Sequence, residues 1–210
     1  MSTLLKKIGY YTPTIGLLLF VGLSCFAAAH YPGGSPLDAQ TVGFDWRHNY
    51  WCNLFNLQAI NGAFNPARPF AIAATWLACL SLTLFFFIFS AAFSIPNFWK
   101  CTIRISGTIA MSFGALIVTE WHDLMTILSS VFGLFAVVGM LKVIVRSRRS
   151  IWQMTGGICL VLLGLNNYIY YTGHGLYHLA SLQKITLLCV LSWIVLLNFA
   201  AAKQLILEEF

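Results

Sequence analysis

Residues 70–93 read FAIAATWLACLSLTLFFFIFSAAF, a stretch of 24 residues without a charge. A helix needs about 20 mostly apolar residues to cross the hydrocarbon core of a bilayer, so this stretch is long enough. Further segments of similar character, within a few residues at each end, are 14–29, 98–119, 124–145, 151–171 and 185–201. The sequence therefore predicts an all-α, polytopic membrane bundle of about six transmembrane helices, forming a single transmembrane domain over residues 1–210.

The overall composition supports this class. Hydrophobic residues make up 59% of the chain and charged residues 9%, against roughly 25% charged residues in an ordinary soluble domain. A soluble fold cannot bury that much apolar surface, whereas a bilayer accepts it. The first apolar segment follows Lys6 and Lys7 as a signal peptide would, but we expect it to remain as a membrane anchor.

The basic residues predict the orientation. With six spans, both termini lie on the same side as the connections 94–97 and 146–150. Nine of the twelve basic residues fall on that side: Lys6, Lys7, Lys100, Arg104, Lys142, Arg146, Arg148, Arg149 and Lys203. Arg47, Arg68 and Lys184 fall on the other. The positive-inside rule then makes both termini cytoplasmic, and the net charge of +6 needs no nucleic-acid partner.

Most of the ionisable chemistry falls on the opposite, outer face. It carries the 30–69 loop, the turn at 120–123 and the connection at 173–184. All five histidines and four of the six acidic residues lie in these segments: His30, His48, His122, His174, His178, Asp38, Asp45, Glu120 and Asp123. Ionisable groups near a membrane are functional candidates by default.

A four-residue spacing gives the clearest local pattern. Asn166, Tyr170, His174 and His178 form one stripe if the fifth helix continues past residue 171. His174 and His178 could then bind a zinc ion, with His122 as third ligand and water in the fourth position. Glu120 or Asp123 would act as the catalytic base for that water, with Asn166 and Tyr170 contacting substrate.

Two other interpretations of the same residues stay open. Gly173 and Gly175 flank His174 and could end the helix there, which would remove the stripe. The His and Tyr side chains would then be ordinary residues of the interfacial belt. Asp123 would in that case serve as the N-cap of the fourth helix.

The 44–69 stretch reads FDWRHNYWCNLFNLQAINGAFNPARP and mixes aromatic with polar residues. In one interpretation the 30–69 loop is an ordered lid, in which Asp45, Arg47 and His48 bind a polar head group. In the other it is an interfacial segment held by its aromatic side chains.

Short motifs give the chain a family resemblance. The stretch NYWCNL at 49–54, NPARP at 65–69 and HDL at 122–124 resemble the bacterial six-span membrane family called domain of unknown function 998. That family is itself distantly similar to DRAM-like and GPI-remodelling membrane proteins. Its usual Ser-Asp-Leu-Gly would fall at residues 52–55, where this chain differs at three of four positions. The resemblance implies a multi-pass protein of the bacterial plasma (inner) membrane with lipid-related work.

A weaker resemblance is to the alkaline-ceramidase-like membrane hydrolases. It implies that His174 and His178 match that family's paired histidines and that His122 matches the third. This chain has six predicted spans where that family has seven, and no serine stands clearly beside His122.

Two functional hypotheses follow. The first is a metal-dependent hydrolase acting on lipid or amide substrates through the outer-face His/Asp/Glu pocket. The second is a non-catalytic protein that binds membrane lipids or packs as a subunit of a larger membrane complex. Convergence of His122, His174 and His178 within ligand distance of one ion would favour the first.

Overall fold

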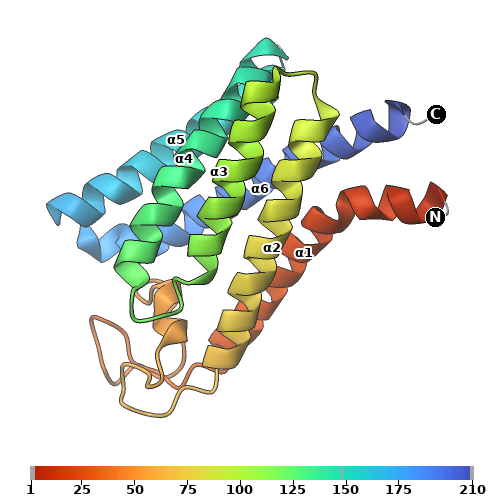
Figure 1. Ribbon diagram of the computed structural model, residues 1–210. Helices are drawn as coiled ribbons and strands as arrows, with labels where there is room; N and C mark the ends of the chain where they lie inside the picture. Colours follow the sequence, from red (N-terminus) through yellow and green to blue (C-terminus); the bar gives the residue numbers. More distant parts are fainter. Residues whose placement is uncertain (1–2, 148, 209–210) are drawn as a thin grey trace. The chain divides into compact units, whose positions relative to one another are not determined.

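The computed structural model describes residues 3–147 and 149–208, which form six α-helices and one short 3-10 helix (Figure 1). Two charged residues, Arg148 and Glu209, lie outside the described residues. The elements are α1 (Thr3–Ala29), η1 (Trp51–Phe55), α2 (Arg68–Ala92), α3 (Asn97–Ala115), α4 (His122–Arg146), α5 (Ser150–Thr172) and α6 (Leu176–Glu208). The predicted all-α class is confirmed.

Four of these helices are long and apolar enough to cross a membrane: α1 from Lys7, α2, α4 and α6. The other two, α3 and α5, are not among these candidate spans. Helix α3 contains Lys100 and Arg104 together with several serines and threonines, and α5 contains Gln153, Asn166 and Asn167. Length and composition thus identify four candidate spans among the described helices.

Several predicted boundaries are wrong. Helix α1 already begins at Thr3 instead of 14, and α6 continues to Glu208 instead of 201. Helix α3 ends at Ala115, because turns follow from Leu116 up to α4. Helix α4 begins at His122 after Trp121, so Asp123 lies in its first turn and is not its N-cap. Helix α6 already begins at Leu176, which places Lys184 inside a helix instead of in a connection.

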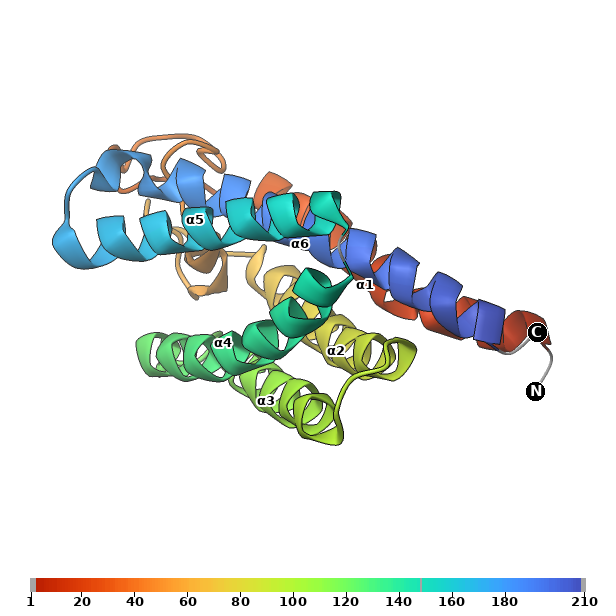
Figure 2. The same cartoon turned by 90° about the horizontal axis from the view of Figure 1, so that it is seen from above.

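The chain forms two compact units, and α1, α2, α5 and α6 each contribute to both. The first comprises the described residues of Met1–Phe20, Thr75–Gln153 and Ile194–Phe210. In it, α3 and α4 lie side by side (Figures 1 and 2). An added Cβ at Gly139 would lie 2.7 Å from Cγ1 of Ile103, so a glycine is what permits this close approach. Buried Asn198 donates hydrogen bonds to the carbonyl of Tyr10 and the hydroxyl of Thr14, joining α6 to α1.

The second unit comprises Val21–Ala74 and Met154–Trp193. It contains the segment between α1 and α2, drawn in orange in Figure 1. That segment is folded around a small apolar core together with the end of α1 and the start of α2. Its buried members are Ala27, Ala28, Tyr31, Phe44, Leu54, Ala59, Ala67 and Ala71, with Trp51 and Phe55 packed against them. Stacked and edge-on rings of Phe44, Trp46 and Trp51 give this unit its aromatic centre.

Candidate functional site

Asp45 and His48 form the best-defined polar pair of the second unit. Oδ2 of Asp45 lies 2.7 Å from Nδ1 of His48, and Oδ1 accepts the backbone N–H of Arg47 at 2.8 Å. Burial would raise the pKa of Asp45. The hydrogen bonds from the His48 ring and from the backbone N–H groups of Arg47 and His48 outweigh this effect, so the pKa falls below its usual value of 3.8. Asp45 is therefore ionised at neutral pH and accepts a hydrogen bond from Nδ1–H of His48. This contact orients the imidazole ring so that Nε2 faces away from the carboxylate.

Lys184 anchors this pair to α6. Its side chain is buried at 9% exposure, and its ammonium donates to the carbonyl oxygens of Asn49 and of Ala180. The ammonium also lies 5.5 Å from the centre of the Phe44 ring, a cation–π contact. One turn earlier, the Ser181 hydroxyl donates to the carbonyl of Arg47 at 2.9 Å. The 47–49 backbone is thus fixed on the first turns of α6.

The asparagines of the 49–54 and 65–69 motifs are structural. Asn49 is fully buried, donates to the carbonyl of Gly34 at 2.9 Å and accepts the N–H of Asp45. Asn65 is also buried and donates to the carbonyls of Leu54 and Asn56. Each side chain satisfies backbone groups of a segment that is irregular outside the short helix η1, so these motifs specify the shape of the segment.

Three buried polar atoms of this region lack a hydrogen-bond partner among the described residues: Nε2 of His48, Nε1 of Trp51 and Oε1 of Gln183. They belong to the 44–51 segment and to the start of α6, which Lys184 and Ser181 hold together. The His48 ring packs on Tyr177, with 5.0 Å between ring centres. A buried unpaired polar atom costs about 1–3 kcal/mol, so such atoms usually have a bound water or ligand as partner.

The turn before α4 carries Glu120, one of the two predicted bases, and the first turn of α4 carries the other, Asp123, next to the predicted metal ligand His122. Nδ1 of His122 lies 3.2 Å from Oδ1 of Asp123, and the Asp123 side chain is 82% exposed. Glu120 is also exposed. These three residues belong to the first compact unit, whereas His174 and His178 belong to the second.

The predicted four-residue stripe is wrong, because α5 ends at Thr172. Gly173 and Gly175 adopt positive φ angles of 74° and 87°, and His174 lies between the two helices. Glycine is the residue that takes this conformation at little cost, so the pair ends one helix before the next begins. His174 and His178 are both exposed, and His178 lies in the first turn of α6.

The two remaining stripe residues have other surroundings. Asn166 donates to the hydroxyl of Thr186 at 2.6 Å and to the carbonyl of Leu162, which links α5 to α6. Tyr170 is 56% exposed and its ring packs edge-on against Tyr171. Asn166 therefore has a structural partner within its own unit.

Across residues 3–147 and 149–208, no group of three or more His, Cys, Asp or Glu side chains is placed to hold a metal ion. The zinc site at His122, His174 and His178 thus stays a prediction without structural support.

Sequence reasoning named Asp45, Arg47 and His48 but missed Lys184, Trp51 and Gln183. The Arg47 side chain is exposed. Its backbone carbonyl joins the segment to α6 by accepting a hydrogen bond from Ser181. Lys184 was counted only as a topological charge. One feature of the sequence indicates its role. A single lysine near the start of an apolar helix needs a hydrogen-bond acceptor or an opposite charge if it is buried.

No protein-family model, no curated protein and no solved structure matches this chain. The fold defines a class of protein. It is all-helical, and four of its described helices are long and apolar enough to cross a membrane. A folded polar segment lies between the first two helices.

Proposed function

We propose that the chain is a multi-pass protein of the bacterial plasma membrane, with six spans and both termini in the cytoplasm. The four apolar helices support the membrane location. Helices α3 and α5, of 19 and 23 residues, are close to the length of a span. The nine-to-three division of the basic residues supports the orientation.

Labelling with a membrane-impermeant maleimide tests this topology. Ala39→Cys and Lys203→Cys place thiols at exposed positions in the first connection and near the end of α6. We expect added labelling of intact spheroplasts for Ala39→Cys, and added labelling for Lys203→Cys only after the membrane is opened. The unsubstituted chain, with its own six cysteines, is the control. Labelling of both positions from the same side would contradict the proposed topology.

We further propose that the second unit binds the polar head group of a membrane lipid without chemically changing it. The observation that carries this proposal is the set of three unpaired buried polar atoms on His48, Trp51 and Gln183. They comprise an N–H donor, an amide oxygen acceptor and an imidazole nitrogen that accepts when neutral. A head group carrying both hydroxyl and carbonyl groups could satisfy all three. The resemblance of residues 49–54 and 65–69 to a family with lipid-related work supports the same proposal.

Gln183→Leu tests the head-group site, because it removes one unpaired acceptor with little change of volume. We expect the lipid that co-purifies with the wild-type protein in mild detergent to bind about tenfold more weakly, since one hydrogen bond is worth about 1 kcal/mol and often more when buried. Native mass spectrometry of the purified full chain, titrated with the lipids extracted from its host membrane, measures this binding.

Gln58→Leu is the matched control, because Gln58 is exposed and lies in the segment between α1 and α2 of the same compact unit. It should bind lipid as the wild type does. If Gln183→Leu also binds like the wild type and unfolds at a higher temperature, the unpaired oxygen is only a structural cost and the head-group proposal is wrong.

A hydrolase is the second candidate, and the Asp45–His48 pair is the observation that favours it. A carboxylate that orients an imidazole is the arrangement of a general base. The pair contacts no nucleophile among the described residues: Nε2 of His48 is unpaired, and the Ser181 hydroxyl donates to a backbone carbonyl. The attacking group would therefore be a water molecule. Release of fatty acid or amine from the bound lipid, abolished by His48→Gln, would identify a hydrolase; an unchanged lipid mass would identify a binding protein.

A further inference from the structure

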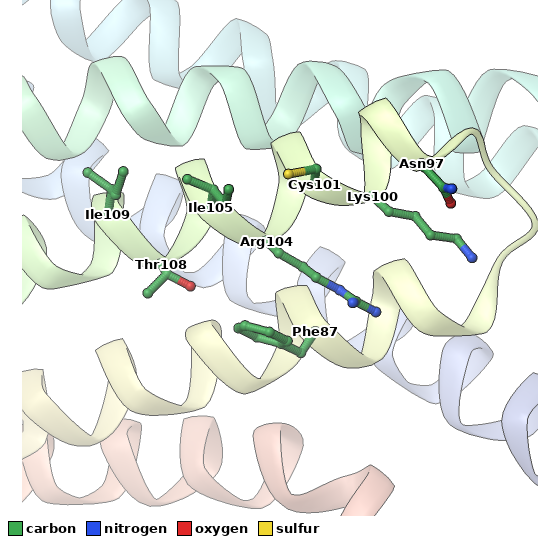
Figure 3. Close-up of a pocket in the computed structure, with 8 residues that line it drawn as sticks. All are labelled: Phe87, Asn97, Lys100, Cys101, Arg104, Ile105, Thr108 and Ile109. Atoms are coloured by element: carbon green, nitrogen blue, oxygen red, sulfur yellow. The ribbon is translucent and has the colours of Figure 1, made fainter.

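A groove lies between α2 and α3 within the first compact unit, and none of its lining residues belongs to the candidate site described above. It has a volume of about 590 Å³, which is within the range of ligand-binding pockets. Figure 3 shows its walls, with Lys100 and Arg104 extending from α3 on the side of α2. The lining residues are Phe87, Asn97, Lys100, Cys101, Arg104, Ile105, Thr108 and Ile109.

The groove is polar at one end and apolar at the other. Asn97, Lys100 and Arg104 follow one another at three- and four-residue spacing from the start of α3, so they share one face of the helix. Ile105 and Ile109 line the groove farther along. From Lys100 to Ile109 the helix rises about 13 Å at 1.5 Å per residue. The polar end also coincides with the N-terminus of α3, where the helix dipole is positive.

Arg104 is held in position but retains donors. Its Nε donates to the hydroxyl of Ser90 at 2.7 Å, and its guanidinium lies 5.5 Å from the centre of the Phe87 ring. These contacts fix the plane of the guanidinium. An arginine has five N–H donors in a fork that matches a phosphate, and the Ser90 contact uses one of them.

The two cations have no acidic neighbour in sequence that could neutralise them. No Asp or Glu occurs between residues 46 and 119 or between 124 and 207. Uncompensated positive charge at the edge of a membrane attracts anionic lipid. The basic end of the groove is thus complementary in charge to an anion. The rest of the groove is apolar and matches a hydrocarbon chain.

A hydroxyl on the groove wall points to the same conclusion. Thr102, Ser106 and Ser112 of α3 each donate to the carbonyl four residues earlier, as hydroxyl residues in helices commonly do. Thr108 lines the groove, and its buried hydroxyl has no partner among the described residues. Pairing this hydroxyl with a bound molecule would remove the cost of an unpaired buried group.

We propose that this groove binds an anionic phospholipid. The phosphate lies against Lys100 and Arg104, the glycerol backbone passes Ile105, an ester oxygen lies near Thr108, and an acyl chain continues from Ile109. A lipid so placed runs parallel to α3, with its charge at one end of the helix and its hydrocarbon toward the middle, as a bilayer lipid does. This inference does not depend on the head-group site at His48, because it uses other residues and another compact unit.

The test is binding of phosphatidylglycerol and of phosphatidylcholine to the full chain in a neutral detergent, measured by native mass spectrometry. The wild type should prefer phosphatidylglycerol. Lys100→Gln combined with Arg104→Gln should weaken phosphatidylglycerol binding roughly 30-fold, because each basic residue near a membrane surface contributes about fivefold to tenfold to anionic-lipid affinity. Phosphatidylcholine binding should barely change.

Arg146→Gln combined with Lys203→Gln is the matched control, since it removes the same charge at exposed positions outside the groove. This control should bind phosphatidylglycerol like the wild type. Equal losses in both double variants would show that only total charge matters and would overturn the groove assignment. Displacement of the lipid by an equal concentration of glycerol phosphate would show a site for the free phosphate compound and would overturn the assignment to a lipid.

Discussion

Replacing Lys184 with Met should release the 44–51 segment from α6. The substitution keeps the length of the apolar stem but removes the ammonium that donates to the carbonyls of Asn49 and Ala180. A hydrogen bond from a charged group contributes about 1.5–3 kcal/mol, and part of the loss is recovered because a buried charge no longer needs to be desolvated. A net loss of about 2–3 kcal/mol corresponds to local opening that is roughly 30- to 150-fold more frequent.

Amide hydrogen exchange of the full chain in detergent measures this opening. The effect should be confined to residues 44–51 and the first turns of α6, with α3 and α4 unchanged. Lys203→Met is the control, because Lys203 is exposed near the other end of the same helix. Equal exchange of residues 44–51 in both variants would mean that Lys184 does not anchor the segment.

The helices could be predicted from the sequence because an apolar run of about 20 residues has few alternatives to a helix. The apolar segment predicts a start of the last helix at 185, whereas α6 begins nine residues earlier, at Leu176. Hydropathy reports the apolar part of a helix, whereas the helix itself continues until a residue ends it. No Gly or Pro occurs between residues 176 and 208, so the longer helix was already consistent with the sequence.

The histidine stripe failed for a related reason. Periodicity describes which side chains share a face only while the helix continues. The two glycines beside His174 were recognised as an alternative helix end, and their positive φ angles confirm that interpretation. Where a regular spacing crosses a pair of glycines, the glycines carry the stronger physical argument, because a positive φ cannot be accommodated within an α-helix.

The contacts that define the candidate site were beyond the reach of sequence spacing. Lys184 and Asn49 lie 135 positions apart, and Ser181 and Arg47 lie 134 apart. Residues within one segment could be grouped by composition, which is why Asp45 and His48 were named. Pairing that segment with the start of α6 requires the tertiary fold, and so do the unpaired atoms of Trp51 and Gln183.

Gly34→Ala should strongly destabilise the folded segment. Gly34 adopts a φ of +84°, and an added Cβ would lie 2.4 Å from the backbone nitrogen of Asn61 and 2.8 Å from the carbonyl carbon of Ile60. Backbone atoms cannot rotate away as a side chain can. The left-handed conformation costs an L-residue about 1–2 kcal/mol, and overpacking adds about 1–3 kcal/mol, so we expect a loss of about 3 kcal/mol.

Gly43→Ala separates these two terms, because Gly43 has a φ of +72° but nothing within 4 Å of the added Cβ. It should lose only the conformational part, about 1–2 kcal/mol. The rings of Tyr31, Phe44, Trp46 and Trp51 pack on one another, so near-ultraviolet circular dichroism reports the folding of this segment directly. On heating, its signal should be lost earliest in Gly34→Ala, with a midpoint shift at least twice that of Gly43→Ala. Equal shifts would mean that the approach of Gly34 to Asn61 contributes nothing, and that conformational strain alone requires glycine at both positions.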